Sequence, residues 1–259
     1  MCRIISFASI KGGVGKTSII YTLSGLLAEH NHKVCVIDGY FNVNQLSLMY
    51  LKIGGVDLKE YLSGKTSSRE VLNKCLSNLY FVKTNSVAYD YLKHTELIKF
   101  FISEIAENFE YILIDVNCFN EKISSLFFDS SNECFVVLDD EVFTIRNTAK
   151  LIQKVYLYNN IYNLKLILNK QRIIKAIKKN VLACEDIFSM LKVEGIFVFK
   201  KYFKDNIFCS KLKGDSKSNV LSKFYKSVIG NTYYKVDYFK PYRGVVGYFR
   251  RLKYERYEV

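Results

Sequence analysis

The sequence predicts an α/β fold with a doubly wound, mostly parallel sheet and a C-terminal amphipathic tail. Seven short apolar runs alternate with stretches of helical length along nearly all of the 259 residues. The runs are continuously apolar, as expected for strands that helices cover on both faces. Repeated strand–helix units with right-handed crossovers build such a sheet. We expect one large domain at 1–230 and a tail at 231–259.

The expected strands follow the apolar runs in chain order. They are RIISFAS (3–9), KVCVID (33–38), LYFVK (79–83), YILIDV (111–116), CFVVLD (134–139), LKLILN (164–169) and EGIFVF (194–199). Helices are expected at 17–30, 94–108, 144–158, 180–191 and 218–229. Ligands of such sheets bind beyond the carboxyl ends of the strands. The site is therefore expected in the loops after Ser9, Asp38, Asp115, Asp139 and Asn169.

The basic residues are concentrated in the last third of the chain. Residues 1–169 hold 17 Lys/Arg and 17 Asp/Glu, whereas residues 170–259 hold 21 and 8 and so carry the whole formal net charge of +13. A basic surface of this kind suits nucleic acid or acidic lipid. A solvated basic face is the alternative interpretation.

Cysteine placement and hydropathy argue against a disulfide-bonded protein and against a membrane-spanning one. None of the seven cysteines forms a CxxC pair and most lie in apolar runs, which indicates reduced thiols in a cytosolic protein. No apolar run reaches the roughly 18–20 residues of a membrane span. The strand expected at 3–9 leaves no room for a signal peptide.

Residues 10–18 fit a phosphate-binding loop between a strand and a helix. Its glycines let consecutive backbone N–H groups face an anion, and the start of the following helix adds to that attraction. Lys16 would neutralise β/γ-phosphate charge, and the Thr17 hydroxyl would ligate Mg²⁺. The residues expected to bind the nucleotide are Gly12, Gly13, Val14, Gly15, Lys16, Thr17 and Ser18.

Two aspartates end apolar strands that lie close to this loop in the expected sheet. Asp115, in YILIDV, is the expected second Mg²⁺ partner, reaching the metal through water. Asp38 ends KVCVID at the tip of the neighbouring strand. An aspartate that caps a helix is the structural alternative for each of them.

A series of motifs in order resembles the MinD/ParA family of dimeric ATPases over about residues 2–230, and at several points MinD more than ParA. The motifs are KGGVGKT (11–17), NLYFVKTNS (78–86), EYILID (110–115), DEVFTIRNTAKLIQ (140–153), LKLILNK (164–170) and KDNIFCSKLKGDS (204–216). The resemblance implies a P-loop NTPase fold of the SIMIBI type, with ATP and Mg²⁺ as cofactors.

The resemblance also assigns roles to four residues. Lys11 is implied to cross a dimer interface to the phosphates bound by the other subunit, so that ATP holds a homodimer together. Asn169 is implied to recognise adenine. The implied catalytic set is Lys11, Lys16 and Asp38.

The motifs linked to hydrolysis depart from the family pattern. The family has Asp-x-Asp after the second strand, and its second Asp orients the attacking water; here that position is Tyr40. A phenol with an ordinary pKa near 10 is a poor substitute. Asn117, Cys118 and Phe119 replace the small and rigid residues after the other acidic motif, and KKYF (200–203) stands where a proline is often found. We expect slow or absent ATP hydrolysis, unless Asp38 or another group positions the water.

The tail combines aromatic and basic residues in an amphipathic pattern. At about 100° per residue, one arc of about 120° collects Tyr242, Val245, Val246, Phe249 and Leu252. The opposite side carries Arg243, Arg250 and Arg251. This pattern is typical of a helix lying in a membrane interface and resembles the membrane-targeting helix of MinD. The alternative is a helix packed on the protein's own sheet or on a partner.

Three functions remain open. The first is a MinD-like ATPase at the inner face of the cell membrane that positions a partner, such as a MinC-like protein, in division-site selection. The second is a ParA-like DNA partition or positioning protein. The third is a nucleotide-bound scaffold without useful turnover. Clustered tyrosines also suggest bacterial tyrosine kinases, which lack the KGG lysine.

Overall fold

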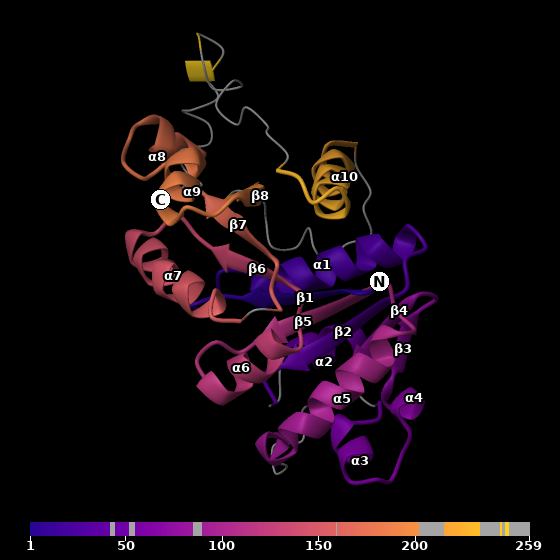
Figure 1. The fold of residues 1–259 in the computed structure, drawn as a ribbon. Coiled ribbons are helices and arrows are strands. Elements are labelled where there is room, and N and C mark those ends of the chain that lie inside the picture. Colours follow the sequence, from indigo (N-terminus) through magenta and orange to yellow (C-terminus); the bar gives the residue numbers. More distant parts are fainter. Residues whose placement is uncertain are drawn as a thin grey trace. The chain divides into compact units, whose positions relative to one another are not determined.

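The computed structural model describes residues 1–41, 45–51, 55–84, 90–158, 160–201, 215–233, 244 and 247–248. These residues form an eight-stranded, mostly parallel sheet with flanking helices, which confirms the predicted fold class (Figure 1). The strand order is β3-β4-β2-β5-β1-β6-β7-β8. The strands are β1 (Arg3–Ala8), β2 (Val34–Gly39), β3 (Asn73–Leu76), β4 (Leu79–Val82), β5 (Tyr111–Val116), β6 (Glu133–Leu138), β7 (Asn163–Gln171) and β8 (Gly195–Lys200).

All five expected helices are present with shifted ends, and further short helices join them. The largest shift is in α9, which was expected from residue 180 and begins at Cys184. The helices are α1 (Lys16–Glu29), α2 (Gln45–Leu51), α3 (Leu58–Leu62), α4 (Ser68–Val71), η1 (Tyr91–His94), α5 (Thr95–Ala106), α6 (Glu121–Asp129), α7 (Val142–Val155), α8 (Ile173–Ile177), α9 (Cys184–Leu191) and α10 (Asp215–Ile229).

The chain divides into two compact units. The first comprises Met1–Ser9, Lys16–Phe135 and Gln153–Leu164, and the second comprises Ile10–Gly15, Val136–Ile152 and Lys165–Val259. In the first unit β5 lies between β1 and β2, parallel to both. Every residue of β2 and β5 is buried, as their continuously apolar sequences predict.

One strand of the first unit differs from the prediction. The β3 strand pairs antiparallel with β4, so 73–82 forms a hairpin where only a strand at 79–83 was expected. Its sequence NKCL is short and half exposed, and Leu76 is 55% exposed. A short, polar edge strand buries too little apolar surface to produce the signal of a central strand.

An aromatic cluster joins β8 and α10 in the second unit. Phe224 of α10 contacts Phe197 and Phe199 of β8 at ring-centroid distances of 5.3 and 5.0 Å. All three rings are buried. This contact explains why the expected final helix forms part of this unit.

Several sequence-based expectations fall outside the described residues. They include most of the motif at 204–216, and the tail residues Val245, Val246, Phe249, Arg250, Arg251 and Leu252. Within the described part of the chain, no helix has both the length and the apolar character needed to cross a membrane.

Candidate nucleotide site

Two buried carboxylates lie side by side at the carboxyl ends of β2 and β5. Asp38 and Asp115 are direct partners in the strand register, and at most 1% of either residue is exposed. The register also pairs Asp115 with Phe7 near the end of β1, the strand that leads into the glycine-rich loop. Parallel strands thus bring together carboxylates that are 77 positions apart in the sequence.

Asp115 contacts both functional side chains at the start of α1. The Thr17 hydroxyl donates a hydrogen bond of 2.8 Å to Asp115 Oδ2. Lys16 Nζ forms an ion pair with Asp115 Oδ1. Hydroxyl and carboxylate oxygens are the ligands that Mg²⁺ prefers, so Thr17 and Asp115 fit a magnesium ion held directly and through water.

Burial changes the protonation of Lys16. Its side chain is only 4% exposed, and this burial lowers its pKa to about 8, although the nearby Cys118 and Asp38 act in the opposite direction. A lysine with this pKa keeps most of its charge at neutral pH. It is therefore available to bind phosphate.

Tyr40 lies over Lys16. Its ring centroid is 4.8 Å from Lys16 Nζ. The backbone N–H of Tyr40 donates a hydrogen bond of 3.1 Å to Asp38 Oδ1. This bond between the side chain of Asp38 and the backbone two residues later is typical of a turn, here at the end of β2. The next residue, Phe41, has a left-handed φ of 55° and stacks on Tyr91 at 4.7 Å. The buried stack stabilises the turn that presents the Tyr40 ring.

The Tyr40 phenol has no basic character in this position. Burial first, and then the nearby Cys118 and Asp38, raise its pKa to about 12. A neutral phenol can donate a hydrogen bond but cannot take a proton from water at physiological pH. Slow hydrolysis because of Tyr40 stays a prediction.

Cys118 is a member of this site that sequence reasoning treated only as a departure from the family. Burial raises the pKa of its thiol, although the nearby Lys16 opposes that shift. The six described cysteines are all free thiols. The following residue, Phe119, is 67% exposed.

The glycine-rich loop belongs to the second unit, where the end of β7 binds its backbone. Asn169 Nδ2 donates to the Val14 carbonyl at 2.7 Å, and Lys170 Nζ donates to the Gly13 carbonyl at 2.7 Å. Gly15 has a φ of 92°, and a Cβ there would lie 2.3 Å from Asn169 Nδ2. Asn169, expected to read adenine, thus contacts the loop itself. Lys170 was missed, and its only sequence signal is its place in LILNK.

The loop leaves room for an anion around its first glycines. A Cβ built on Gly12 or Gly13 would meet nothing within 4 Å, and Gly13 has a φ of 75°. Ser18 lies in the first turn of α1, where its carbonyl accepts a hydrogen bond of 2.9 Å from Thr22. Open space beside a curled backbone fits phosphate groups.

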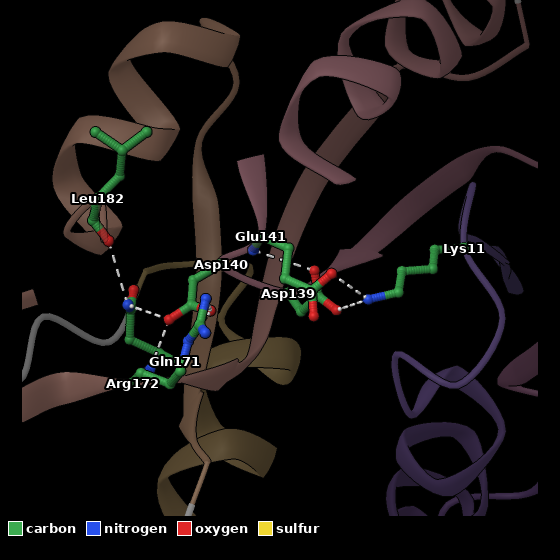
Figure 2. A network of polar contacts seen from close by, with 7 residues as sticks. All are labelled: Lys11, Asp139, Asp140, Glu141, Gln171, Arg172 and Leu182. Carbon is green, nitrogen blue, oxygen red and sulfur yellow. Dashed lines mark hydrogen bonds and ion pairs between the residues drawn. The ribbon is translucent and has the colours of Figure 1, made fainter. Parts of the chain in front are cut away.

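Lys11 is bound by two carboxylates from the segment after β6. Lys11 Nζ lies 2.8 Å from Asp139 Oδ2 and 2.7 Å from Glu141 Oε2 (Figure 2). These two hydrogen bonds raise the pKa of Lys11. Its side chain is still 32% exposed. Lys11 is thus bound by carboxylates of its own chain.

Comparison with known proteins gives a consistent relationship. Residues 2–168 match the family model described as an AAA domain. An uncharacterised ATP-binding protein of Methanocaldococcus jannaschii is 28% identical over 57% of each chain. The septum site-determining protein MinD of Thermotoga maritima is 32% identical over 44% of each chain. The chain therefore spans about half the length of these two curated relatives.

Solved structures share the fold. The MinC:MinD complex of Aquifex aeolicus matches with a TM-score of 0.74 and 22% identity, covering 88% of this chain and 96% of that one. MinD of Pyrococcus horikoshii complexed with Mg-ADP matches with a TM-score of 0.72 and 20% identity, covering 88% of this chain and 96% of that one. A putative plasmid partition protein of Borrelia burgdorferi bound to AMPPNP matches with a TM-score of 0.65 and 19% identity, covering 89% of this chain and 99% of that one.

The family model covers more than half of the chain, and the relatives in sequence include MinD proteins. The chain belongs to this AAA domain family and is similar to proteins of the MinD/ParA group.

Proposed function

We propose that this protein binds Mg-ATP, pairs with a second copy in the ATP state, and attaches to anionic membrane through its tail to position a protein partner. The observation that carries the proposal is the contact of Lys16 and Thr17, at the start of α1, with Asp115. A domain at 1–230 would bind the nucleotide, and the tail at 231–259 would bind the membrane.

Each residue of the site has a distinct task in nucleotide binding. Lys16 would leave Asp115 and pair with the β/γ-phosphates, and backbone N–H groups of the loop would surround them. Thr17 would hold the metal directly, and Asp115, released from Lys16, would hold it through water. Magnesium, when bound, neutralises phosphate charge. Asn169 would accept and donate hydrogen bonds at the adenine edge.

Slow turnover follows from the chemistry of Tyr40. The position from which a carboxylate would orient water carries a neutral phenol whose ring faces Lys16. Asp38 is the nearest alternative, but its Oδ1 accepts the backbone N–H of Tyr40. We therefore propose an ATP-bound state that lasts longer than a carboxylate at position 40 would allow.

The homodimer depends on Lys11. Its ammonium would exchange the carboxylates of Asp139 and Glu141 for the phosphates bound by the other copy. ADP lacks the γ-phosphate and would hold the pair less well. A fold neighbour is the MinC:MinD cell division complex of Aquifex aeolicus, which supports a protein partner of the MinC kind, with division-site selection as the process.

Membrane attachment would be coupled to pairing through valency. The five side chains of the apolar arc would be only partly buried, so each would gain less than the roughly 1.5–3 kcal/mol of full burial. Basic residues add about 1 kcal/mol each near anionic lipid, and ordering the tail subtracts from the sum. Two tails on one dimer bind far better than one. The protein would therefore act at the cytoplasmic face of the membrane in its ATP state.

DNA is the second candidate surface. The net charge of +13 lies wholly in residues 170–259, and a putative plasmid partition protein shares the fold. Binding of this kind would be non-specific and would weaken steeply with salt.

Sedimentation with anionic liposomes tests the proposal. Full-length protein should pellet with Mg-ATP and remain largely in solution with Mg-ADP. The double variant Phe249→Glu/Leu252→Glu should remain in solution with either nucleotide. Tyr254→Glu, opposite the apolar arc on the helical pattern, is the matched control and should still pellet. If wild type stays in solution with both nucleotides, the tail is no lipid anchor, and salt-sensitive binding to duplex DNA would then favour the partition function.

A further inference from the structure

We propose that Asn169 and Lys170 are positioning residues that order the glycine-rich loop before any nucleotide arrives. The inference rests on the proposed function, because it assigns the preparation of the phosphate site to side chains at the end of β7. Asn169 donates a hydrogen bond to the Val14 carbonyl and Lys170 donates one to the Gly13 carbonyl, each with a length of 2.7 Å. Binding two carbonyls from one side directs the N–H groups of the same peptides toward the open side of the loop.

The geometry of the loop requires this close approach. Gly15 adopts a φ of 92°, and any side chain there would collide with Asn169 Nδ2. Asn169 is buried, with only 6% of the residue exposed. Its Oδ1 accepts the backbone N–H of Lys170 at 2.9 Å. One amide group thus joins the loop to the backbone of the residue that makes the second contact.

The Lys170 backbone is held in a conformation that lysine rarely adopts. Its φ is 58°, in the left-handed region that disfavours side chains with a Cβ. The neighbouring residues fix this bend, because Asp140 accepts hydrogen bonds from the side chain of Gln171 at 3.0 Å and from the backbone N–H of Arg172 at 2.7 Å. Strain of this kind persists only where the surroundings determine the conformation.

Asp140 makes the support rigid. Besides those two bonds, it accepts Arg172 Nε and pairs with Arg172 Nη2, both at 2.8 Å, and it is 3% exposed (Figure 2). Gln171 also donates to the Leu182 carbonyl at 3.2 Å. The flanking Asp139 and Glu141 bind Lys11 at the beginning of the same loop. Residues 139–141 and 169–172 therefore brace the loop at both of its ends.

Inorganic tripolyphosphate separates this role from recognition of the base, because it has phosphates and no adenine. With Mg²⁺ and full-length protein, Lys170→Met and Asn169→Ala should each weaken tripolyphosphate binding about three- to tenfold, the usual effect of one lost hydrogen bond. Lys170→Arg keeps a donor and should recover most of the affinity. Lys192→Met is the matched control, since Lys192 is exposed and also left-handed, with a φ of 54°.

Two further readouts distinguish loop order from charge. In about 0.5 M salt the screening length is about 4 Å, so a loss caused by long-range charge alone would disappear, whereas the loss from Lys170→Met should persist. Hydrogen exchange of the nucleotide-free protein needs no ligand. The loop amides of 12–16 should exchange faster in both variants and at the wild-type rate in Lys192→Met.

Different failures identify different errors. Normal tripolyphosphate binding and normal loop exchange in both variants would overturn the inference. A loss confined to ATP in Asn169→Ala would show that Asn169 reads only the base. Wild-type protein that binds neither ATP nor tripolyphosphate would refute the proposed function, while the exchange measurement would still decide whether the loop is ordered by these two residues.

Discussion

Lys16 is a buried lysine whose charge is needed by a bound phosphate. Burial lowers its pKa to about 8, and its ammonium contacts Asp115 on one side and the Tyr40 ring on the other. A phosphate adds negative charge beside Lys16 and must raise this pKa. Nucleotide binding above neutral pH is therefore linked to proton uptake.

This linkage predicts a pH dependence of binding. Between pH 7 and pH 9 the charged fraction of a group with a pKa of about 8 falls from about nine in ten to about one in ten. The affinity for Mg-ATP should therefore fall about tenfold over this range. Calorimetry in buffers of different ionisation enthalpy should show close to one proton taken up per ATP near pH 9. A flat affinity without proton uptake would contradict the assigned pKa.

The phenol at position 40 makes a second prediction. Tyr40→Asp places a carboxylate where water must be oriented, and general-base catalysis contributes about 10²–10⁴-fold. Phosphate release from Mg-ATP should rise at least about tenfold in this variant. Tyr40→Phe is the control and should leave turnover as slow as in wild type. If Tyr40→Phe abolishes a measurable wild-type rate, the phenol takes part in hydrolysis.

Single residues differed in how well the sequence predicted them. Lys16, Thr17 and Asp115 came from motifs whose spacing fixes their chemistry, and the strand register then placed Asp38 against Asp115. The position of the Tyr40 ring over Lys16 depends on a turn stabilised by Phe41 and by Tyr91, which lies 50 positions later in the sequence. No local pattern carries such a contact.

At the scale of elements, the carboxyl end of β2 packs closely against β5 and α6. A Cβ on Gly39 would lie 2.6 Å from the Asp115 carbonyl and 2.7 Å from Phe127. Both neighbours are buried and neither is the flexible end of a long side chain. The glycine in the sequence IDGY is therefore needed for the approach of the two strands at the site.

Gly39→Ala should destabilise the protein by about 1–3 kcal/mol, because overpacking displaces buried neighbours. It should also weaken Mg-ATP binding, since the displaced backbone carries Asp115. Gly25→Ala is the matched control: its Cβ would meet nothing within 4 Å in the middle of α1. That change should stabilise by about 0.5–1 kcal/mol. Equal free energies of unfolding for the two variants in urea would refute this account of Gly39.

Elements were predictable where their burial is strong. The seven expected strands form because each is a continuous apolar run, whereas β3 escaped because its residues alternate between half-buried and exposed at a sheet edge. The α8 helix escaped for a different reason. It has only five residues and follows β7 through the bend fixed by Asp140, which is a tertiary contact.

At the scale of the whole molecule, the proposed self-association would compete with an internal ion pair. Lys11 would have to leave Asp139 and Glu141 to reach a second copy's phosphates. The pair with Glu141 is exposed and contributes about 0–1 kcal/mol. Asp139 is only 6% exposed, so its pair with Lys11 is the one that ATP would chiefly have to replace. The protein should thus be a monomer without nucleotide.

The molar mass in solution with Mg-ATP and with Mg-ADP, measured by light scattering during size-exclusion chromatography, tests the central claim most directly. Wild type should have twice the 30.1 kDa chain mass with Mg-ATP and the single mass with Mg-ADP. Lys11→Ala should remain monomeric with both nucleotides while still binding ATP, and Lys192→Ala should behave as wild type. A wild-type protein that binds Mg-ATP but stays at the single mass, or a Lys11→Ala variant that dimerises normally, would contradict the account.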